Sequence, residues 1–580
     1  MTTTSPSASN PAPTIVIVGG VAGGASAATR ARRMNEHATI ILFEKDEHVS
    51  FANCGLPYHI GGEIVDRAKL LVATPKLLRD RFRIDARTRH EVTALDRARK
   101  VVAVRNRETG ETFEQPYDKL ILAPGAAPII PPVAGIDARN VFTLRNLADT
   151  DRIKGFVDAA VARGSARPAK AVVIGAGFIG LEMVEALDGR GMHVALVELA
   201  PQVLPPLDAD MARLVEAELR RHHVDLHLGN GLKAFETTTR DGQSVATHVV
   251  LNDGTKLDAD LVIVGVGVRP NVALAKDNGL ALGDTGGIRV DDNLRTSDGD
   301  IYAVGDAAEY THGVADLLMR VPLAGPANRA GRLAGQHAAT GSAPKMAPVM
   351  GTAIVRVFDL VAAVTGAGSR LLDRLKTPYR FLHVRANHHA GYFPGAQPMT
   401  LKLIYQPDTR RVLGAQAVGQ AGVDKRIDVI ATALRFGATV DDLTELDLAY
   451  APPFGSAKDP VHMLGFAAVN DLDGVVHFLA PDADLAGRQV VDLRSDAEVS
   501  QQPLPAADGA AVHHIPVDAL RARLGELDPA KPTTTVCASG VRAYAGARIL
   551  SQHGFTDVTD LSGGVILRTQ LRGNGVAVGA

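Results

Sequence analysis

Residues 171–180 read AVVIGAGFIG, an apolar run that leads into three glycines with the spacing GxGxxG. A short continuous apolar run is typical of a strand buried on both faces of a parallel sheet. The glycines predict a tight turn into a helix whose N-terminal amides bind a pyrophosphate. The next expected strand, 193–197, ends in Glu198, whose carboxylate is placed to meet ribose hydroxyls, and the absence of a following Arg or Lys favours NADH over NADPH. The predicted nucleotide contacts are Gly175, Gly177, Phe178, Ile179, Gly180, Glu182 and Glu198.

A degenerate copy of the same pattern occurs earlier in the chain. Residues 14–18, TIVIV, run into GGVAGG at 19–24, where Val21 takes the usual place of the middle glycine. The next expected strand, 39–43, ends in an acid twenty residues after the last of these glycines. Two fingerprints in one chain are far more specific than one, and they predict two dinucleotides bound side by side. The cofactor contacts predicted from this copy are Gly19, Ala22, Gly23, Glu44 and Lys45.

The stretch 50–58, SFANCGLPY, places Cys54 in a turn about one βαβ unit after the first glycine turn. An isolated cysteine is usually a small buried hydrophobic residue, but its turn-forming and hydrogen-bonding neighbours favour a presented thiol. The chain has only one other cysteine, Cys537, in a different predicted domain, so the usual CxxxxC disulfide is excluded. If Cys54 is redox-active, its oxidised form is a mixed disulfide with a small thiol, a persulfide or a sulfenic acid.

The size and charge of the chain limit the number of domains and the kinds of partner that we expect. A chain of 580 residues is too long for one hydrophobic core, so several domains are expected. Its 62 Lys and Arg against 64 Asp and Glu give a net charge of −2, which makes no electrostatic case for nucleic acid or an anionic membrane surface. Two cysteines favour a reducing compartment, and residues 1–13 resemble a disordered tail more than a signal peptide. We therefore expect a cytoplasmic protein without nucleic-acid or membrane partners, and we predict no metal site.

Two later segments carry further motifs. Residues 296–307, TSDGDIYAVGDA, are a short strand running into Gly305 and Asp306, a pattern that is also compatible with a purely structural turn. Residues 537–542, CASGVR, follow an apolar strand and open a helix, so backbone N–H groups surround the Cys537 sulfur and stabilise an attached anionic sulfur. Such a cradle can also hold phosphate, but a loop this short favours a single sulfur atom.

The motifs GGVAGG, SFANCGLPY, GAGFIGLE, VGDA, KRIDVIATAL, AYAPPFGSAKDPV and CxxGxR, in this order, form a specific pattern. Residues 14–465 resemble the coenzyme A disulfide reductase branch of the flavin-dependent pyridine nucleotide–disulfide oxidoreductases, and residues from about 480 to 580 resemble a single rhodanese domain. The fusion resembles coenzyme A disulfide reductases with a rhodanese domain, including NADH-dependent persulfide and polysulfide reductases. The resemblance implies FAD and NADH as cofactors, bound coenzyme A, and a homodimer whose active site is shared between subunits.

The resemblance also implies roles for individual residues. Cys54 is expected to face the flavin, with Ser50 and Asn53 lining the thiol-substrate site and Asn53 also near the cofactor. Asp306 is expected to bind the ribityl chain of the flavin. The catalytic residues implied by the resemblance are Cys54, Tyr392, Tyr450, Cys537 and Arg542, and the two tyrosines are expected to act as proton donors from the partner subunit.

The expected coenzyme A site lies on the helix after the first glycine turn. Ser26, Arg30 and Arg33 match the positions that hold coenzyme A in the family, and its phosphates require cations. Without the family match, each arginine is as well explained as a solvated helix residue.

The predicted fold class is therefore α/β, with two Rossmann-like dinucleotide-binding domains, an α+β dimerisation domain and a C-terminal α/β rhodanese domain. The expected boundaries are 14–150 and 285–345 for the FAD domain, 151–284 for the NADH domain, 346–466 for the dimerisation domain, 467–482 for a linker and 483–580 for the rhodanese domain.

The expected activity is the reduction by NADH of persulfide, polysulfide, coenzyme A persulfide or coenzyme A disulfide, and the sequence leaves the choice among these acceptors open. One alternative is an NADH oxidase or peroxidase that cycles Cys54 through a sulfenic acid. Another alternative is a redox-sensing scaffold protein in which the rhodanese domain only docks a partner.

Overall fold

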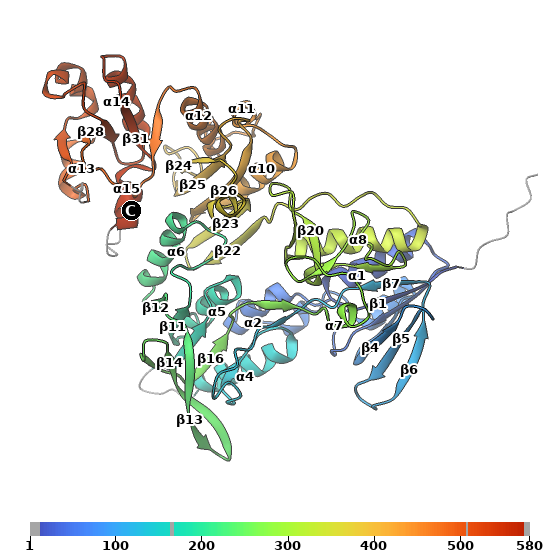
Figure 1. Ribbon diagram of the computed structural model, residues 1–580. Helices are drawn as coiled ribbons and strands as arrows, with labels where there is room; N and C mark the ends of the chain where they lie inside the picture. The colour runs from blue at the N-terminus through green and yellow to red at the C-terminus, as the bar shows by residue number, and fades with distance from the viewer. Residues whose placement is uncertain (1–11, 163–167, 506–508, 573–580) are drawn as a thin grey trace, which may run out of the picture. The chain divides into compact units, whose positions relative to one another are not determined.

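The computed structural model describes residues 12–162, 168–505 and 509–572 (Figure 1). Residues 1–11 of the predicted tail and residues 573–580 of the predicted rhodanese domain lie outside the described residues. The chain divides into two compact units. Met1–Gly175, Met183–Val194 and Leu232–Val349 form the first unit, and Ala176–Glu182, Ala195–Gly231 and Met350–Ala580 form the second.

The first unit is built on a five-stranded parallel sheet in the order β19-β7-β1-β2-β3. Ile15, Val16 and Ile17 of the central strand are completely buried, as the continuous apolar run requires. The predicted strands 14–18 and 39–43 are confirmed. The strands are β1 (Thr14–Val18), β2 (Thr39–Phe43), β3 (Asp85–Arg87), β7 (Lys119–Leu122) and β19 (Ile301–Ala303).

Two helices distant in sequence, α1 (Ala22–Met34) and α8 (Ala324–Thr340), pack side by side in this unit (Figure 1). Their backbones approach closely because α8 presents glycines to α1. A Cβ at Gly331 would lie 2.2 Å from Gly23 O, and a Cβ at Gly335 would lie 2.2 Å from Ala27 O. Any larger residue at these two positions would therefore push the helices apart.

Smaller elements complete the first unit. The helices are α2 (Leu56–Gly61), α3 (Pro75–Phe82), α4 (Leu147–Ala162) and α7 (Ala273–Lys276). The antiparallel strands are β4 (His90–Asp96), β5 (Val101–Asn106), β6 (Thr112–Pro116), β13 (Leu232–Arg240), β14 (Gln243–Leu251), β15 (Lys256–Asp258), β8 (Ala126–Pro128) and β17 (Val268–Pro270). The remaining small sheet contains β18 (Ile288–Arg289), β20 (Ala308–Thr311) and β21 (Leu318–Arg320).

The second glycine turn has the strand–turn–helix–strand order that GxGxxG predicts. Strand β10 (Lys170–Ile174) pairs in parallel with β16 (Leu261–Val264), and β16 pairs with β9 (Val141–Phe142). Helix α5 (Phe178–Asp188) follows the turn, and β11 (His193–Glu198) follows α5. Strand β11 pairs in parallel with β12 (Asp225–Leu228), and α6 (Ala209–Arg221) connects the two.

Residues 350–472 of the second unit form an antiparallel sheet with helices, as the α+β prediction requires. The strand order is β22-β23-β26-β25-β24. The strands are β22 (Ala353–Val357), β23 (Leu360–Gly366), β24 (Arg380–Asn387), β25 (Pro398–Tyr405) and β26 (Val412–Gly419). The helices are α9 (Ser369–Leu375), α10 (Val423–Arg435), α11 (Val440–Thr444) and α12 (Pro460–Leu472).

The C-terminal part of the second unit is a parallel sheet in the order β27-β31-β30-β28-β29. Its strands are β27 (His477–Leu479), β28 (Gln489–Asp492), β29 (Ala511–His514), β30 (Thr533–Val536) and β31 (Val558–Leu561), and its helices are α13 (Asp496–Gln501), α14 (Val541–Ser551) and α15 (Gly564–Arg572). The segment 467–482, expected to be a linker, is structured. Helix α12 continues to Leu472, and the half-buried strand β27 extends the edge of the sheet by pairing with β31. A run of only three strand residues is too short to be recognised by periodicity.

None of the described helices is both long enough and apolar enough to cross a bilayer.

Candidate active sites

The first glycine turn is built around Gly19 and the carboxylate of Glu44. Gly19 has a φ of +95°, and a Cβ there would lie 2.1 Å from Ala123 O, so only glycine fits. Glu44 Oε2 accepts the Gly20 N–H at 2.8 Å, and Oε1 accepts the Asp46 N–H at 2.9 Å. Burial raises the pKa of Glu44, and these amide hydrogen bonds oppose the rise. The structure thus holds this carboxylate beside the turn, where the sequence places the ribose contact.

The GDA motif lies against the same turn. A Cβ at Gly23 would lie 2.9 Å from Val304 Cγ2 and 3.6 Å from Gly305 N. The Gly305 N–H donates to the Tyr310 hydroxyl at 2.6 Å, which fixes the backbone next to Asp306. Asp306 is half-buried, and burial raises its pKa. The fold therefore brings together two predicted contacts of one nucleotide that are far apart in sequence.

Two further predicted contacts border this turn. Ala22 is the first residue of α1 and is half-buried. Lys45 directly follows Glu44 and is also half-buried, and burial lowers its pKa, with a smaller contribution from the charge of Arg145.

The loop that carries Cys54 is joined to the first glycine turn by backbone hydrogen bonds. Ser50 has a φ of +45°, which is uncommon for a residue with a side chain, and its N–H donates to Gly20 O at 2.8 Å. Its carbonyl accepts the Val72 N–H at 2.9 Å. Cys54 and Asn53 are exposed in the 3₁₀ turn Asn53–Gly55 that precedes α2. The loop that is hydrogen-bonded to the glycine turn therefore exposes the Cys54 thiol.

The predicted coenzyme A residues on α1 meet polar residues of α8. Ser26 Oγ donates to Asn328 Oδ1 at 2.6 Å, and Arg30 Nη2 donates to Gln336 Oε1 at 2.5 Å. Asn328, Arg332 and Gln336 recur every four residues and therefore share one face of α8. The sequence interpretation missed these three residues, although the small residues along the adjacent strip of α8 could have shown which side packs on another helix.

Positive charge is concentrated on this face. Burial, followed by the charges of Arg332 and Arg33, lowers the pKa of Arg30. Arg33 is exposed, and its guanidinium lies 5.1 Å from the centre of the Phe82 ring, a cation–π distance. Like-charged side chains kept this close together are suited to an anion such as a phosphate.

The second glycine turn repeats the carboxylate geometry of the first. Glu198 Oε2 accepts the Ala176 N–H at 2.7 Å, and Oε1 accepts the Ala200 N–H at 2.8 Å. Gly175 has a φ of +105°, and a Cβ there would lie 2.4 Å from Gly265 O. These contacts match those of Glu44 and Gly19, so both acids end their strands in the same local arrangement.

The rest of this turn is open to a ligand. A Cβ at Gly177 would meet no heavy atom within 4 Å, so the space beside it is available for a pyrophosphate. Ile179 is exposed, Phe178 and Glu182 are half-buried, and Gly180 is buried in the first turn of α5. The residues present therefore fit a dinucleotide.

Tyr392 and Tyr450 come together on the surface of the second unit. Their hydroxyls are 3.0 Å apart, and the residues are 76% and 48% exposed. This hydrogen bond raises the pKa of Tyr392. Phe393 and Phe454, in the same two loops, are also exposed at 38% and 71%. Exposed aromatic side chains in one patch are typical of an interface between subunits.

Cys537 lies at the bottom of a backbone cradle at the end of β30. The residue is only 1% exposed, and the Gly540 N–H donates to its Sγ at 3.1 Å. The Val565 N–H donates to Cys537 O at 2.8 Å, and the Ile566 N–H donates to Ala538 O at 3.2 Å. The first turn of α15 therefore supports the loop that carries Cys537.

The arginine of this loop is already paired. Arg542 Nη1 and Nη2 donate to the two carboxylate oxygens of Glu498 at 2.7 and 2.5 Å. This pairing lowers the pKa of Glu498 to about 2 and raises that of Arg542, to which Cys537 contributes further. The positive charge beside Cys537 is therefore largely neutralised, a feature that the CxxGxR motif alone did not predict.

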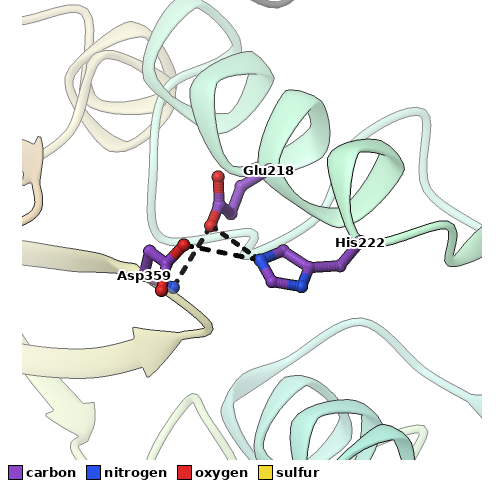
Figure 2. A group of neighbouring side chains, drawn as sticks. All are labelled: Glu218, His222 and Asp359. Atoms are coloured by element: carbon purple, nitrogen blue, oxygen red, sulfur yellow. Dashed lines mark hydrogen bonds and ion pairs between the residues drawn. The ribbon is translucent and has the colours of Figure 1, made fainter. Parts of the chain in front are cut away.

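A separate group of potential metal ligands contains Glu218, His222 and Asp359, whose ligand atoms lie within 4.8 Å of one another (Figure 2). The group joins the end of α6 to the turn between β22 and β23. Arg221 Nη2 donates to Glu218 Oε1 at 2.6 Å and also to Asp359 Oδ2, and His222 stacks on Phe358 with ring centres 3.9 Å apart. Because a guanidinium already balances both carboxylates, this group is an ion-pair network.

Three family models match the chain that carries these sites. Residues 13–331 match pyridine nucleotide-disulphide oxidoreductase, residues 352–460 match the dimerisation domain of the same proteins, and residues 480–565 match a rhodanese-like domain. The first match alone covers more than half of the chain. The chain belongs to the pyridine nucleotide-disulphide oxidoreductase family. The predicted family and fold class are thereby confirmed, and the family uses FAD and NAD(H).

Individual relatives are similar over most or all of their length. A coenzyme A disulfide reductase of Staphylococcus aureus is 38% identical over 456 residues, which are 79% of this chain and 100% of the relative. The crystal structure of reduced Bacillus anthracis CoADR-RHD has a TM-score of 0.90 and 44% identity, covering 97% of this chain and 98% of that one. The structure of a NAD-dependent persulfide reductase from A. fulgidus has a TM-score of 0.88 and 36% identity, covering 96% of this chain and 99% of that one.

Proposed function

We propose that this protein uses NADH to reduce the sulfur–sulfur bond of coenzyme A disulfide, coenzyme A persulfide or a related persulfide or polysulfide. The observation that carries the proposal is the exposed Cys54 thiol on a loop hydrogen-bonded to a dinucleotide turn. The names of the relatives, coenzyme A disulfide reductase and NAD-dependent persulfide reductase, support the same chemistry.

The two glycine turns would hold the two cofactors. Gly19, Ala22, Gly23, Glu44 and Lys45, with Asn53 and Asp306, would bind FAD, and the turn from Gly175 to Gly180, with Glu182 and Glu198, would bind NADH. Bound together, these cofactors supply the two electrons of the reaction. Glu198, like Glu44, offers a carboxylate to a ribose and would repel a 2′-phosphate, which favours NADH over NADPH.

Cys54 would carry out the covalent step. Its thiolate attacks one sulfur of the substrate, forms a new S–S bond and expels hydrosulfide or coenzyme A as a thiolate. Two electrons and a proton then cleave the new bond and regenerate the Cys54 thiolate. Ser50 and Asn53 flank the thiol and would line the substrate site.

The substrate would be held by the basic face of α1 and α8. Arg30 and Arg33 supply cations for the phosphates of coenzyme A, and Ser26 supplies a hydroxyl. Arg332 extends the same face. Residues of α8 would therefore join those of α1 that the sequence predicts for this site.

The matched dimerisation domain and the exposed aromatic patch support a homodimer. Tyr392 and Tyr450 of the partner subunit would then donate the proton that the leaving thiolate requires. The two thiols of the chain also agree with a reducing, cytoplasmic setting.

Cys537 and Arg542 would form a sulfur carrier in the proposed rhodanese domain. In that step an S–S bond of Cys537 persulfide breaks while an acceptor thiolate forms a new one, so no net electrons are consumed. We assign residues 14–150 and 285–345 to the FAD domain, 151–284 to the NADH domain, 346–466 to the dimerisation domain and 483–580 to the rhodanese domain.

The decisive experiment measures anaerobic NADH oxidation and released sulfide with polysulfide, coenzyme A persulfide and coenzyme A disulfide. Wild type, Cys54→Ser and Cys537→Ser are compared. Sulfide release from the sulfane acceptors that disappears in Cys54→Ser supports the proposal. Turnover with oxygen alone, or full activity of Cys54→Ser, contradicts it and favours the oxidase or a Cys54-independent reaction.

A further inference from the structure

A buried chain of hydrogen bonds connects the C-terminal parallel sheet to the antiparallel sheet and to the start of α6. The His383 N–H on β24 donates to Ser562 Oγ at 2.6 Å, and this hydroxyl is also 3.2 Å from His383 Nδ1. His383 Nε2 lies 2.9 Å from Asp210 Oδ2. Ser562 is 2% exposed, and the His383 side chain is completely buried. Three segments distant in sequence therefore meet at one polar contact within the second unit.

The charges around His383 fix the direction of each bond. Lys402 Nζ lies 2.7 Å from Asp210 and 2.9 Å from Asp208, so the carboxylates face a buried cation. Although burial alone would raise the pKa of Asp210, hydrogen bonds from His383 and Lys402 hold it well below its ordinary value. Asp210 is thus an acceptor, Nε2 of His383 carries the proton, and Nδ1 is left as an acceptor.

These roles require a hydroxyl at position 562. Ser562 Oγ accepts the His383 amide proton and donates its own proton to Nδ1 of the same residue. An alanine would leave both His383 groups unpaired in a buried setting, which is costly. The serine, histidine and aspartate resemble a hydrolase triad in their chemistry, but the buried and doubly bonded hydroxyl is in no position to attack a substrate.

Ser562 is directly connected to the cradle of Cys537. It directly follows β31 and is followed by Gly563 and Gly564, which lead into α15. Gly564 has a φ of +67°, and a Cβ there would lie 2.5 Å from Cys537 O. The following amide, Val565 N–H, donates to the same carbonyl. The residue that bonds to His383 is thus three positions from a residue that holds the Cys537 backbone.

We propose that Ser562 and His383 are positioning residues that hold the Cys537 cradle in a fixed place on the antiparallel sheet, so that sulfur carried on Cys537 is delivered to the reductase site. This inference rests on the proposed function. A second contact agrees with it, because Arg213 of α6 donates to Leu571 O at the end of α15 at 3.3 Å.

The test uses the full-length protein with three variants. Ser562→Ala removes the hydroxyl. His383→Gln keeps a donor for Asp210 and the backbone N–H bond to Ser562, and it removes only the Nδ1 acceptor. Ser551→Ala is the matched control, because its hydroxyl on the exposed side of α14 bonds only to Ala547 O within its own helix.

Three rates are measured for each variant: sulfur transfer from thiosulfate to cyanide, NADH oxidation with coenzyme A disulfide, and NADH-dependent sulfide release from a persulfide. For each variant, sulfide release is measured again after Cys537→Ser is added to it. The difference between the two rates is the part of sulfide release that depends on Cys537. We expect this part to fall at least about tenfold in Ser562→Ala and His383→Gln, while the two separate rates stay within about twofold. Ser551→Ala should leave all three unchanged.

Hydrogen–deuterium exchange supplies a readout that does not depend on activity. The amides of residues 383, 562 and 563 should exchange faster in Ser562→Ala and His383→Gln than in wild type, while those of Val565 and Ile566, which bind the Cys537 loop, should not. The inference is overturned if the Cys537-dependent part of sulfide release is unchanged in the variants or is absent in wild type. It is also overturned if all three rates fall equally. Failure of wild type to oxidise NADH with any sulfur acceptor would instead contradict the proposed function, and the exchange measurement would still decide whether the contact positions the cradle.

Discussion

The two cysteines of this chain lie in opposite surroundings. Cys54 is exposed on a loop that is hydrogen-bonded to the first glycine turn, whereas Cys537 is 1% exposed and its Sγ accepts the Gly540 N–H. An exposed thiol can attack a sulfur atom that belongs to a large substrate. A buried sulfur can carry one additional sulfur atom, and its burial restricts access by a larger group. The difference agrees with the proposal that the first site breaks S–S bonds reductively and that the second transfers sulfur.

The largest expected effect separates the two sites directly. Cys54→Ser should reduce NADH oxidation with coenzyme A disulfide by at least about a thousandfold, because the nucleophile is lost. Sulfur transfer from thiosulfate to cyanide should remain unchanged, and Cys537→Ser should show the reverse pattern. Steady-state rates of both reactions in both variants test the separation. If either substitution abolishes both reactions, the two cysteines act as one site and the comparison fails.

The next largest effect concerns only the site of Cys54. Arg30→Ala and Arg332→Ala should each raise the KM for coenzyme A disulfide about tenfold, since each removes a charged contact to phosphate. The KM for inorganic polysulfide should not change, because polysulfide has no distant phosphates. Arg79→Ala, an exposed arginine on α3, is the control. An equal rise for both acceptors would show that the arginines act through the thiol loop and not through phosphate binding.

A smaller effect concerns only the site of Cys537. Glu498→Gln should raise kcat/KM for thiosulfate about fivefold, because Arg542 would regain a charge available to an anionic donor. NADH oxidation with coenzyme A disulfide should not respond. Glu526→Gln is a suitable control, because Glu526 pairs with Arg523 elsewhere in the same sheet domain. A fall in thiosulfate activity would mean that Glu498 orients Arg542 productively and does not suppress it.

Many features of the two cysteine sites can be predicted from the sequence. Both glycine fingerprints, with Glu44 and Glu198 at the ends of their strands, depend on local backbone geometry, which sequence spacing reports well. The cysteine loops were recognisable for the same reason. The strand His477–Leu479 was missed because it is too short for a periodic pattern and forms only by pairing with β31.

The remaining features of the sites depend on contacts between distant segments. Asn328 and Gln336 become part of the predicted coenzyme A site only because Gly331 and Gly335 let α8 approach α1. Likewise, no motif in the sequence indicates that Ser562 would meet His383. The sequence therefore predicts which residues are reactive better than it predicts which residues position them.

The smallest expected effect concerns the proton supply at the Cys54 site. The pKa of Tyr392 is raised by its hydrogen bond with Tyr450, in which the Tyr392 hydroxyl is the donor, and this keeps the Tyr392 phenol protonated to higher pH. A donor is lost when it deprotonates, so the rate should fall on the alkaline side as the pH passes this raised pKa. Tyr450→Phe removes the hydrogen bond and should shift the alkaline limb of kcat/KM for coenzyme A disulfide to lower pH. Tyr379→Phe is the control, since its hydroxyl bonds to Asp373 outside this pair. The thiosulfate reaction of Cys537 should keep its pH profile in both variants. An alkaline limb that stays in place in Tyr450→Phe would show that another group supplies the proton to the site of Cys54.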